Sequence, residues 1–208
     1  QEAVYDLPYT VAEGLAAQHK IPREKFLARI EKQMTLGEKF RLQKTAEKTG
    51  NVKLELDISQ IDLTRLALYI LSQPVKVRRE RYEKLHKAMT ESAVRALRRV
   101  PMTLGKVAAV LDASYSMSGS TEKKQRPLGV ALAASYLLGA ASQAYRAFWT
   151  HPIKHELLVQ AQGQTPLGER LLDALSWQPD LVVIISDGFE NDPPLGAAEV
   201  ARVYRQKL

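Results

Sequence analysis

A short apolar run that ends in an acid and two spaced hydroxyls constrains this chain more than any other stretch. Residues 107–111 read Val-Ala-Ala-Val-Leu and lead directly into Asp112, Ser114 and Ser116. A continuous apolar run of this length, bounded by polar residues, is typical of a strand buried on both faces, as in a parallel sheet. The polar side chains then follow the carboxyl end of the strand, which is where open α/β sheets bind ligands. One carboxylate and two hydroxyls are hard oxygen donors suited to Mg²⁺, Mn²⁺ or Ca²⁺.

Two later segments belong with this pattern. Thr165 stands before a predicted helix, and Asp187 follows a second apolar run at 181–185. Together the five residues resemble the metal-ion-dependent adhesion site (MIDAS) of von Willebrand factor type A (vWA) domains, and the resemblance covers about residues 104–208. It implies a doubly wound, mostly parallel, Rossmann-like sheet in which the strands ending at Asp112 and Asp187 are neighbours.

The resemblance also implies a role for each residue. Ser114 and Ser116 are expected to bind the metal directly, and Asp112 to bond to them or to metal-bound water. Thr165 is expected to bind directly or through water, and Asp187 through water. A cation held largely by neutral hydroxyls keeps much of its charge, so its open position attracts an acidic group of a partner protein. The alternative is that Asp112 caps a loop and the serines satisfy backbone groups.

Hydrophobic periodicity and turn residues predict the elements around this site. We expect helices at 126–145, 167–175 and 197–206, strands at 145–150 and 156–160 joined by a hairpin through 151–154, and a strand at 181–185. The vWA family normally has two more strands after this point. The resemblance therefore implies a sheet that is incomplete at its C-terminal side: either the molecule is a fragment, or another chain or segment completes the sheet.

The N-terminal half reads as helical. Helices are expected at 10–18, from Pro22 onward with Phe26, Leu27 and Ile30 on one face, and at 35–46, 63–71 and 76–99, while 51–57 is either a strand or an extended link. The predicted organisation is a helical, basic region at 1–100 followed by a vWA-like domain at 101–208.

Positive charge is concentrated in this half. Residues 1–100 hold 20 Lys/Arg and 13 Asp/Glu, whereas 101–208 hold 10 of each. The helix at 76–99 carries nine basic and three acidic residues. It is either a solvated face with ion pairs four residues apart, or a surface that binds RNA phosphates. The candidate nucleic-acid-binding residues are Arg78, Arg79, Arg81, Lys84, Arg95, Arg98 and Arg99.

A helical part followed by a vWA-like part is also similar to the layout of the Ro family. In that family a helical-repeat TROVE domain precedes a vWA domain, and the protein binds small noncoding RNA. The matching features are the helix-rich order and the basic helix that runs into Val107. Only the final part of a TROVE domain fits into 100 residues. A third possibility is an accessory of an AAA+ ATPase, a common associate of bacterial vWA proteins.

Composition and missing motifs exclude other classes. With no cysteine, the chain has neither disulfides nor thiol chemistry, which fits a reducing cytoplasm. No apolar run approaches the ~20 residues of a membrane span, and no secretion signal is visible, so we expect no membrane association and a cytoplasmic location. Neither a Gly-x-Ser-x-Gly elbow nor a phosphate-binding loop occurs, and a phosphotransferase would need an acid where Ser114 stands. A non-enzymatic role is therefore expected.

Overall fold

The computed structural model describes residues 7, 9–31, 34, 38–39, 42, 58–121 and 124–207. The chain divides into two compact units, residues 1–60 and residues 61–208. Most of the helix expected at 35–46, and all of the strand or link expected at 51–57, lie outside the described residues. None of the helices that the structure describes is long and apolar enough to cross a membrane.

In the described part of the first unit, two α-helices pack together in a small core. These are α1 (Tyr9–Gln18) and α2 (Arg23–Ile30), and the short 3-10 helix η3 (Ile58–Gln60) ends the unit. The predicted apolar face of the second helix is confirmed, because Phe26, Leu27 and Ile30 are all buried in one cluster with Ala12 and Ala16 of α1.

The second unit is built on a sheet of three parallel strands. They are β1 (Leu104–Leu111), β2 (Ser142–Trp149) and β3 (Leu181–Ile185), in the order β2-β1-β3. Leu111, the last residue of β1, pairs with Trp149 on one side and with Ile185 on the other. The strand predicted at 107–111 is therefore central, and its five side chains are completely buried. The expected adjacency of the strands that lead to Asp112 and Asp187 is confirmed.

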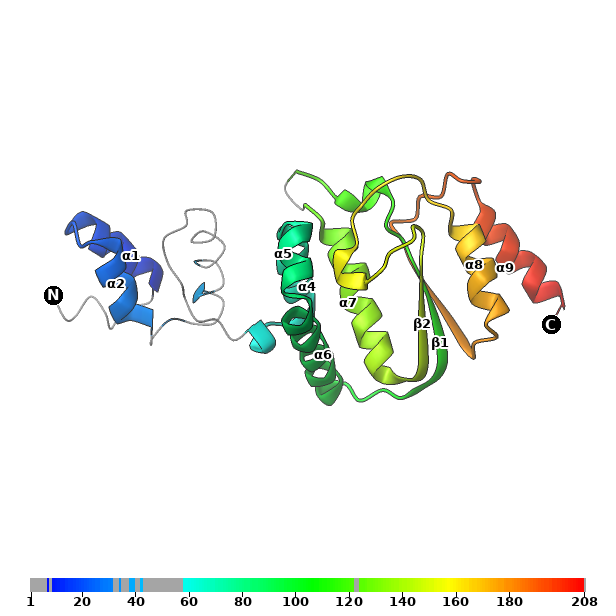
Figure 1. Cartoon of the computed structure of the whole chain (residues 1–208), viewed down its shortest axis with the longest axis horizontal. Coiled ribbons are helices and arrows are strands. Elements are labelled where there is room, and N and C mark those ends of the chain that lie inside the picture. The colour runs from blue at the N-terminus through cyan, green and yellow to red at the C-terminus, as the bar shows by residue number, and fades with distance from the viewer. Residues whose placement is uncertain are drawn as a thin grey trace. The chain divides into compact units, whose positions relative to one another are not determined.

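Helices cover both faces of this sheet (Figure 1). One face carries α7 (Arg126–Ala141), and the other carries α8 (Leu167–Ser176) and α9 (Gly196–Lys207). Side chains alternate along a strand, so Ala108 and Val110 pack with α8 and α9 in one apolar cluster. Strands thus alternate with helices in a Rossmann-like α/β arrangement, as predicted.

Three further helices belong to the second unit, and two of them pack on α7. They are α4 (Leu63–Ser72), α5 (Val75–Glu80) and α6 (Tyr82–Arg99), and both α4 and α6 contact α7. The predicted continuous helix at 76–99 is instead two helices, because the backbone of Arg81 leaves helical geometry at φ −104° and ψ 16°. Residues 61–100 share a compact unit with the sheet, and the domain boundary predicted near residue 100 stays a prediction.

The strand and hairpin predicted at 145–160 are only partly correct. The helix α7 ends at Ala141 and β2 begins at Ser142, opposite Leu104. Residues 156–158 form the 3-10 helix η5 (Glu156–Leu158) and not a strand. The guanidinium of Arg78 donates hydrogen bonds of 2.7 and 2.9 Å to the carbonyl oxygens of Leu157 and Val159. A side chain on α5 thus satisfies carbonyls that in a strand would bond to a neighbouring strand. A short apolar run alone does not distinguish a strand from a 3-10 helix of this kind.

Candidate metal centre

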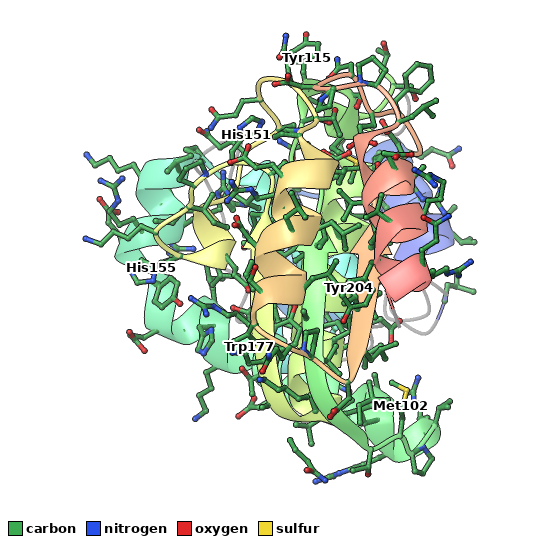
Figure 2. All side chains as sticks on the ribbon, turned by 90° about the vertical axis from the view of Figure 1, so that its right-hand side faces the viewer. Met102, Tyr115, His151, His155, Trp177 and Tyr204 are labelled. Atoms are coloured by element: carbon green, nitrogen blue, oxygen red, sulfur yellow. The ribbon has the colours of Figure 1, made fainter. Side chains whose placement is uncertain are left out.

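The ends of β1 and β3 meet at the carboxyl edge of the sheet. The backbone N–H of Asp112 donates to the carbonyl of Ile185 at 2.9 Å, which continues the pairing of the two strands by one residue. Figure 2 places Tyr115 of the following loop at the opposite end of the unit from Met102, which precedes β1. This edge lies between the face covered by α7 and the face covered by α8 and α9, so it is a topological switch point of the kind that binds ligands.

Asp112 lies at the centre of this edge and its side chain is completely buried. Its Oδ1 accepts a hydrogen bond of 2.7 Å from the backbone N–H of Ser114. Its Oδ2 accepts one of 2.9 Å from the hydroxyl of Ser186. Among the residues that the structure describes, no lysine, arginine or histidine forms an ion pair with it. A buried carboxylate without a cationic partner is costly, and a bound cation would compensate it.

The serine hydroxyls lie next to one another in the loop after β1. A short 3-10 helix, η4 (Tyr115–Ser118), turns the chain so that the Oγ atoms of Ser114 and Ser116 are 3.1 Å apart. Ser114 is buried and Ser116 is exposed, so the pair extends from the carboxylate of Asp112 towards solvent. The spacing Asp-x-Ser-x-Ser therefore brings three oxygen-bearing side chains to one loop.

Backbone hydrogen bonds attach the loop that carries Thr165 to the loop after β1. The N–H of Gln162 donates to the carbonyl of Ala113 at 2.8 Å, and the N–H of Tyr115 donates to the carbonyl of Gly163 at 3.1 Å. Thr165 follows two residues later and is 2% exposed. The helix predicted at 167–175 is confirmed as α8, which begins at Leu167, and Pro166 rather than Thr165 occupies its N-cap.

The close contact between the loop before Thr165 and the loop after Asp112 requires glycine at position 163. Its φ of +66° is left-handed, and a Cβ at this position would lie 2.6 Å from Cε1 of His151. Other residues are strained in this region of backbone space and would also meet the imidazole ring. Glycine therefore allows the loop before Thr165 to bond to the loop after Asp112.

The loop after β3 brings Asp187 to this edge and connects it to the other two segments. Asp187 is exposed, and its Oδ1 accepts a hydrogen bond of 3.1 Å from the N–H of Phe189. Asn191, in the same loop, accepts a hydrogen bond of 2.9 Å from the N–H of Thr165. Glu190 accepts hydrogen bonds from the N–H groups of Gly168 and Ala197, at the first turns of α8 and α9.

Sequence reasoning missed one polar residue of this edge, Ser186, which bonds to Asp112. Asn191 follows Asp187 closely in the sequence, which left open either a supporting role or an ordinary loop role, and it bonds to the backbone of Thr165. The only signal for Ser186 is its position between the apolar run of β3 and Asp187. Asn191 carries no signal beyond its place in a polar loop, because its partner lies 26 residues away in the chain.

The donor set at this edge fits a hard divalent cation. Its oxygens come from one buried carboxylate, two adjacent serine hydroxyls, a buried threonine and an exposed aspartate, all on loops that are hydrogen-bonded to one another. No group of three or more His, Asp or Glu side chains suited to a metal occurs in the described part of the chain. A cation at this edge would therefore depend on hydroxyl ligands, which suits Mg²⁺, Mn²⁺ or Ca²⁺ better than zinc.

The basic residues proposed for RNA do not share one environment. Arg79, Arg81, Lys84, Arg98 and Arg99 are exposed on α5, α6 and the residue between them. Arg78 is the exception, since it is 3% exposed and its guanidinium is engaged by two backbone carbonyls. Arg78 is therefore removed from the proposed nucleic-acid surface. Arg95 is half-buried and donates a hydrogen bond of 2.8 Å to the carbonyl of Ile61.

Comparison with known proteins gives no match for this chain: no protein-family model, no curated protein and no solved structure is similar to it.

Proposed function

We propose that this protein is a non-enzymatic binding module that uses a divalent cation, with Mg²⁺ the first choice, to capture an acidic group of a partner protein. The observation that carries the proposal is the carboxylate of Asp112, which is completely buried and has no cationic partner among the described residues. It lies where three loops of the sheet edge are hydrogen-bonded together. The resemblance to the metal-ion-dependent adhesion site of vWA domains is part of this proposal.

Five side chains would hold the cation: Asp112, Ser114, Ser116, Thr165 and Asp187. Ser114 and Ser116 offer adjacent hydroxyl oxygens, and the buried Asp112 supplies negative charge. When bound, the cation would supply an open coordination position with affinity for a carboxylate oxygen. No histidine or lysine is hydrogen-bonded to either serine hydroxyl among the described residues, so neither is activated as a nucleophile.

Two exposed aromatic side chains flank the proposed site and favour a protein as the partner. Tyr115, between the two serines, is 73% exposed, and Phe189, two residues after Asp187, is 76% exposed. Aromatic side chains are enriched in the centres of protein interfaces. Their positions would let a partner make apolar contacts around an acidic residue held by the cation.

Titration of the full chain with Mn²⁺ and Mg²⁺ by calorimetry, beside the Asp112→Asn variant, tests the proposal. We expect saturable binding to the wild-type chain and loss of at least tenfold in affinity in the variant. Asp173→Asn is the matched control, because it makes the same change on the exposed side of α8. Equal binding by all three proteins would overturn the proposal, as would the lack of any saturable binding to the wild-type chain.

A second candidate function, which rests on the layout shared with the Ro family, is binding of small noncoding RNA by α5 and α6. The observation that favours it is the group Arg79, Arg81 and Lys84, which are exposed and form no ion pair within the described residues. Phosphate contacts of this kind weaken steeply with salt. The double variant Arg79→Glu/Arg81→Glu should lose RNA in a gel shift at low salt, whereas the exposed Lys154→Glu should retain it. Retention by both variants would exclude this surface.

A further inference from the structure

A second site lies on the α7 face of the sheet, in a pocket of about 310 Å³ between α6, α7, β2 and η5. Its walls include three tyrosines, one histidine and one carboxylate: Tyr82, Tyr136, Tyr145, His86 and Glu156. Ligand pockets typically enclose about 300–1,000 Å³, so this one suits a small molecule. None of the residues proposed for the metal lines it.

The carboxylate of Glu156 is held in place but its charge is not paired. Its Oε2 accepts a hydrogen bond of 2.8 Å from the hydroxyl of Ser135, which also lies 2.7 Å from the hydroxyl of Tyr145. No described lysine or arginine forms an ion pair with it. Burial raises the pKa of Glu156, while the Ser135 hydroxyl and the nearby Trp149 indole N–H act in the opposite direction. A cation in the pocket would offset the cost of this desolvated charge.

Aromatic rings surround the approach to this carboxylate. The rings of Tyr82 and His86 are stacked with centroids 5.6 Å apart, and the His86 ring lies 5.5 Å from that of Tyr136. A hydrogen bond of 2.7 Å between Nδ1 of His86 and the Tyr136 hydroxyl fixes these two rings. His155, labelled in Figure 2 on the side of the unit that carries α6, places its ring 4.7 Å from Tyr82. The faces of tyrosine rings attract cations.

We propose that this pocket binds a small alkylated ammonium ion, with Glu156 as its counter-charge and Tyr82, Tyr136 and Tyr145 as its walls. The wall is mainly apolar, which disfavours a strongly hydrated ion. A primary ammonium group has three N–H donors that each need an acceptor, and a mainly apolar wall offers few acceptors. Methyl groups on the nitrogen remove this demand and pack against the rings.

Titration of the full chain with choline and with 3,3-dimethyl-1-butanol, its neutral carbon isostere, tests the proposal by calorimetry or chemical-shift changes. We expect saturable binding of choline and of tetramethylammonium, and at least tenfold weaker binding of the neutral isostere. Nε-trimethyl-lysine amide, titrated alongside, distinguishes a free amine from a side chain of a partner. Equal binding of choline and its isostere, or no saturable binding of either cation, would overturn the proposal.

Single variants separate the contribution of the Glu156 charge to choline binding from that of the Tyr82 ring. Glu156→Gln should weaken choline binding at least tenfold, whereas the exposed Glu83→Gln on α6, with the same change of net charge, should leave it unchanged. Tyr82→Leu should weaken binding several-fold and Tyr82→Phe should restore it, which keeps the test decisive if a change at Glu156 disturbs folding. Asp112→Asn should have no effect. Undiminished binding in both Glu156→Gln and Tyr82→Leu would exclude this pocket.

Discussion

The hydroxyl of Ser186 donates a hydrogen bond of 2.9 Å to Oδ2 of Asp112 and so joins the ends of β3 and β1. The same Ser186 oxygen accepts a hydrogen bond of 3.1 Å from the N–H of Gly188, which turns the chain after Asp187. One side chain therefore fixes a buried carboxylate and the loop that carries a second carboxylate.

Removal of the Ser186 hydroxyl should destabilise the protein even without metal. Ser186→Ala leaves one oxygen of a buried carboxylate unpaired, and a hydrogen bond to a charged group is worth about 1.5–3 kcal/mol. Urea denaturation in EDTA should show a loss of this size. Ser176→Ala is the control, because that hydroxyl donates to the carbonyl of Leu172 on an exposed helix face, and we expect a change within about 0.5 kcal/mol. Equal losses in the two variants would contradict the role of Ser186.

Arg78 should contribute to stability, and its neighbour Arg79 should not. Arg78→Met removes two charge-assisted hydrogen bonds to the carbonyls of Leu157 and Val159, and we expect about 3 kcal/mol of destabilisation from the free energy of unfolding in urea. Arg79→Met changes the same charge on an exposed side chain, and the expected change is within about 0.5 kcal/mol. A larger effect at Arg79 than at Arg78 would be inconsistent with this arrangement.

Gly163→Ala should disturb both folding and the proposed metal site. The left-handed backbone and the contact with the His151 ring together predict a loss of about 1–3 kcal/mol. Because the carbonyl of Gly163 accepts from the N–H of Tyr115, the loop between Ser114 and Ser116 should also lose its position and bind Mn²⁺ more weakly. Gly14→Ala, in α1 with nothing within 4 Å of the added Cβ, is the control. This control variant should be neutral or stabilising by up to about 1 kcal/mol. Thermal unfolding measures the change in stability, and calorimetric titration measures the binding of Mn²⁺.

Glu156 should make stability depend on pH. Burial raises the pKa of this carboxyl above its ordinary 4.5, so the folded chain holds the proton more tightly than the unfolded chain. Stability from this group is present below pH 4.5 and declines as pH rises through the raised pKa. Glu156→Gln removes the decline, so the difference in unfolding free energy between variant and wild type should grow in favour of the variant from pH 4 towards pH 8. The unfolding free energies are measured in urea without added amines. A difference between variant and wild type that stays constant from pH 4 to pH 8 would contradict this role of Glu156.

The fold was largely accessible from sequence because burial of strands leaves a simple pattern. Residues 107–111 and 181–185 are apolar without interruption, and both are strands of one parallel sheet. The run at 157–159 is also apolar, but residues 156–158 form a 3-10 helix, since the carbonyls of Leu157 and Val159 bond to Arg78 from a segment about 80 residues earlier. A distant side chain that satisfies a backbone group leaves no mark in the local sequence.

By itself, the sequence determined the parallel core, the alternation of its central strands with helices, and the position of Asp112 with its two serines at a strand end. These features depend on local hydrophobic pattern and on spacing within a few residues. Only the tertiary structure decided that Ser186 bonds to Asp112, that Asn191 bonds to Thr165, and that Glu156 faces three tyrosines from α6, α7 and β2. Each of these joins residues far apart in the chain, and the geometry that pairs them exists only once helices and strands have packed.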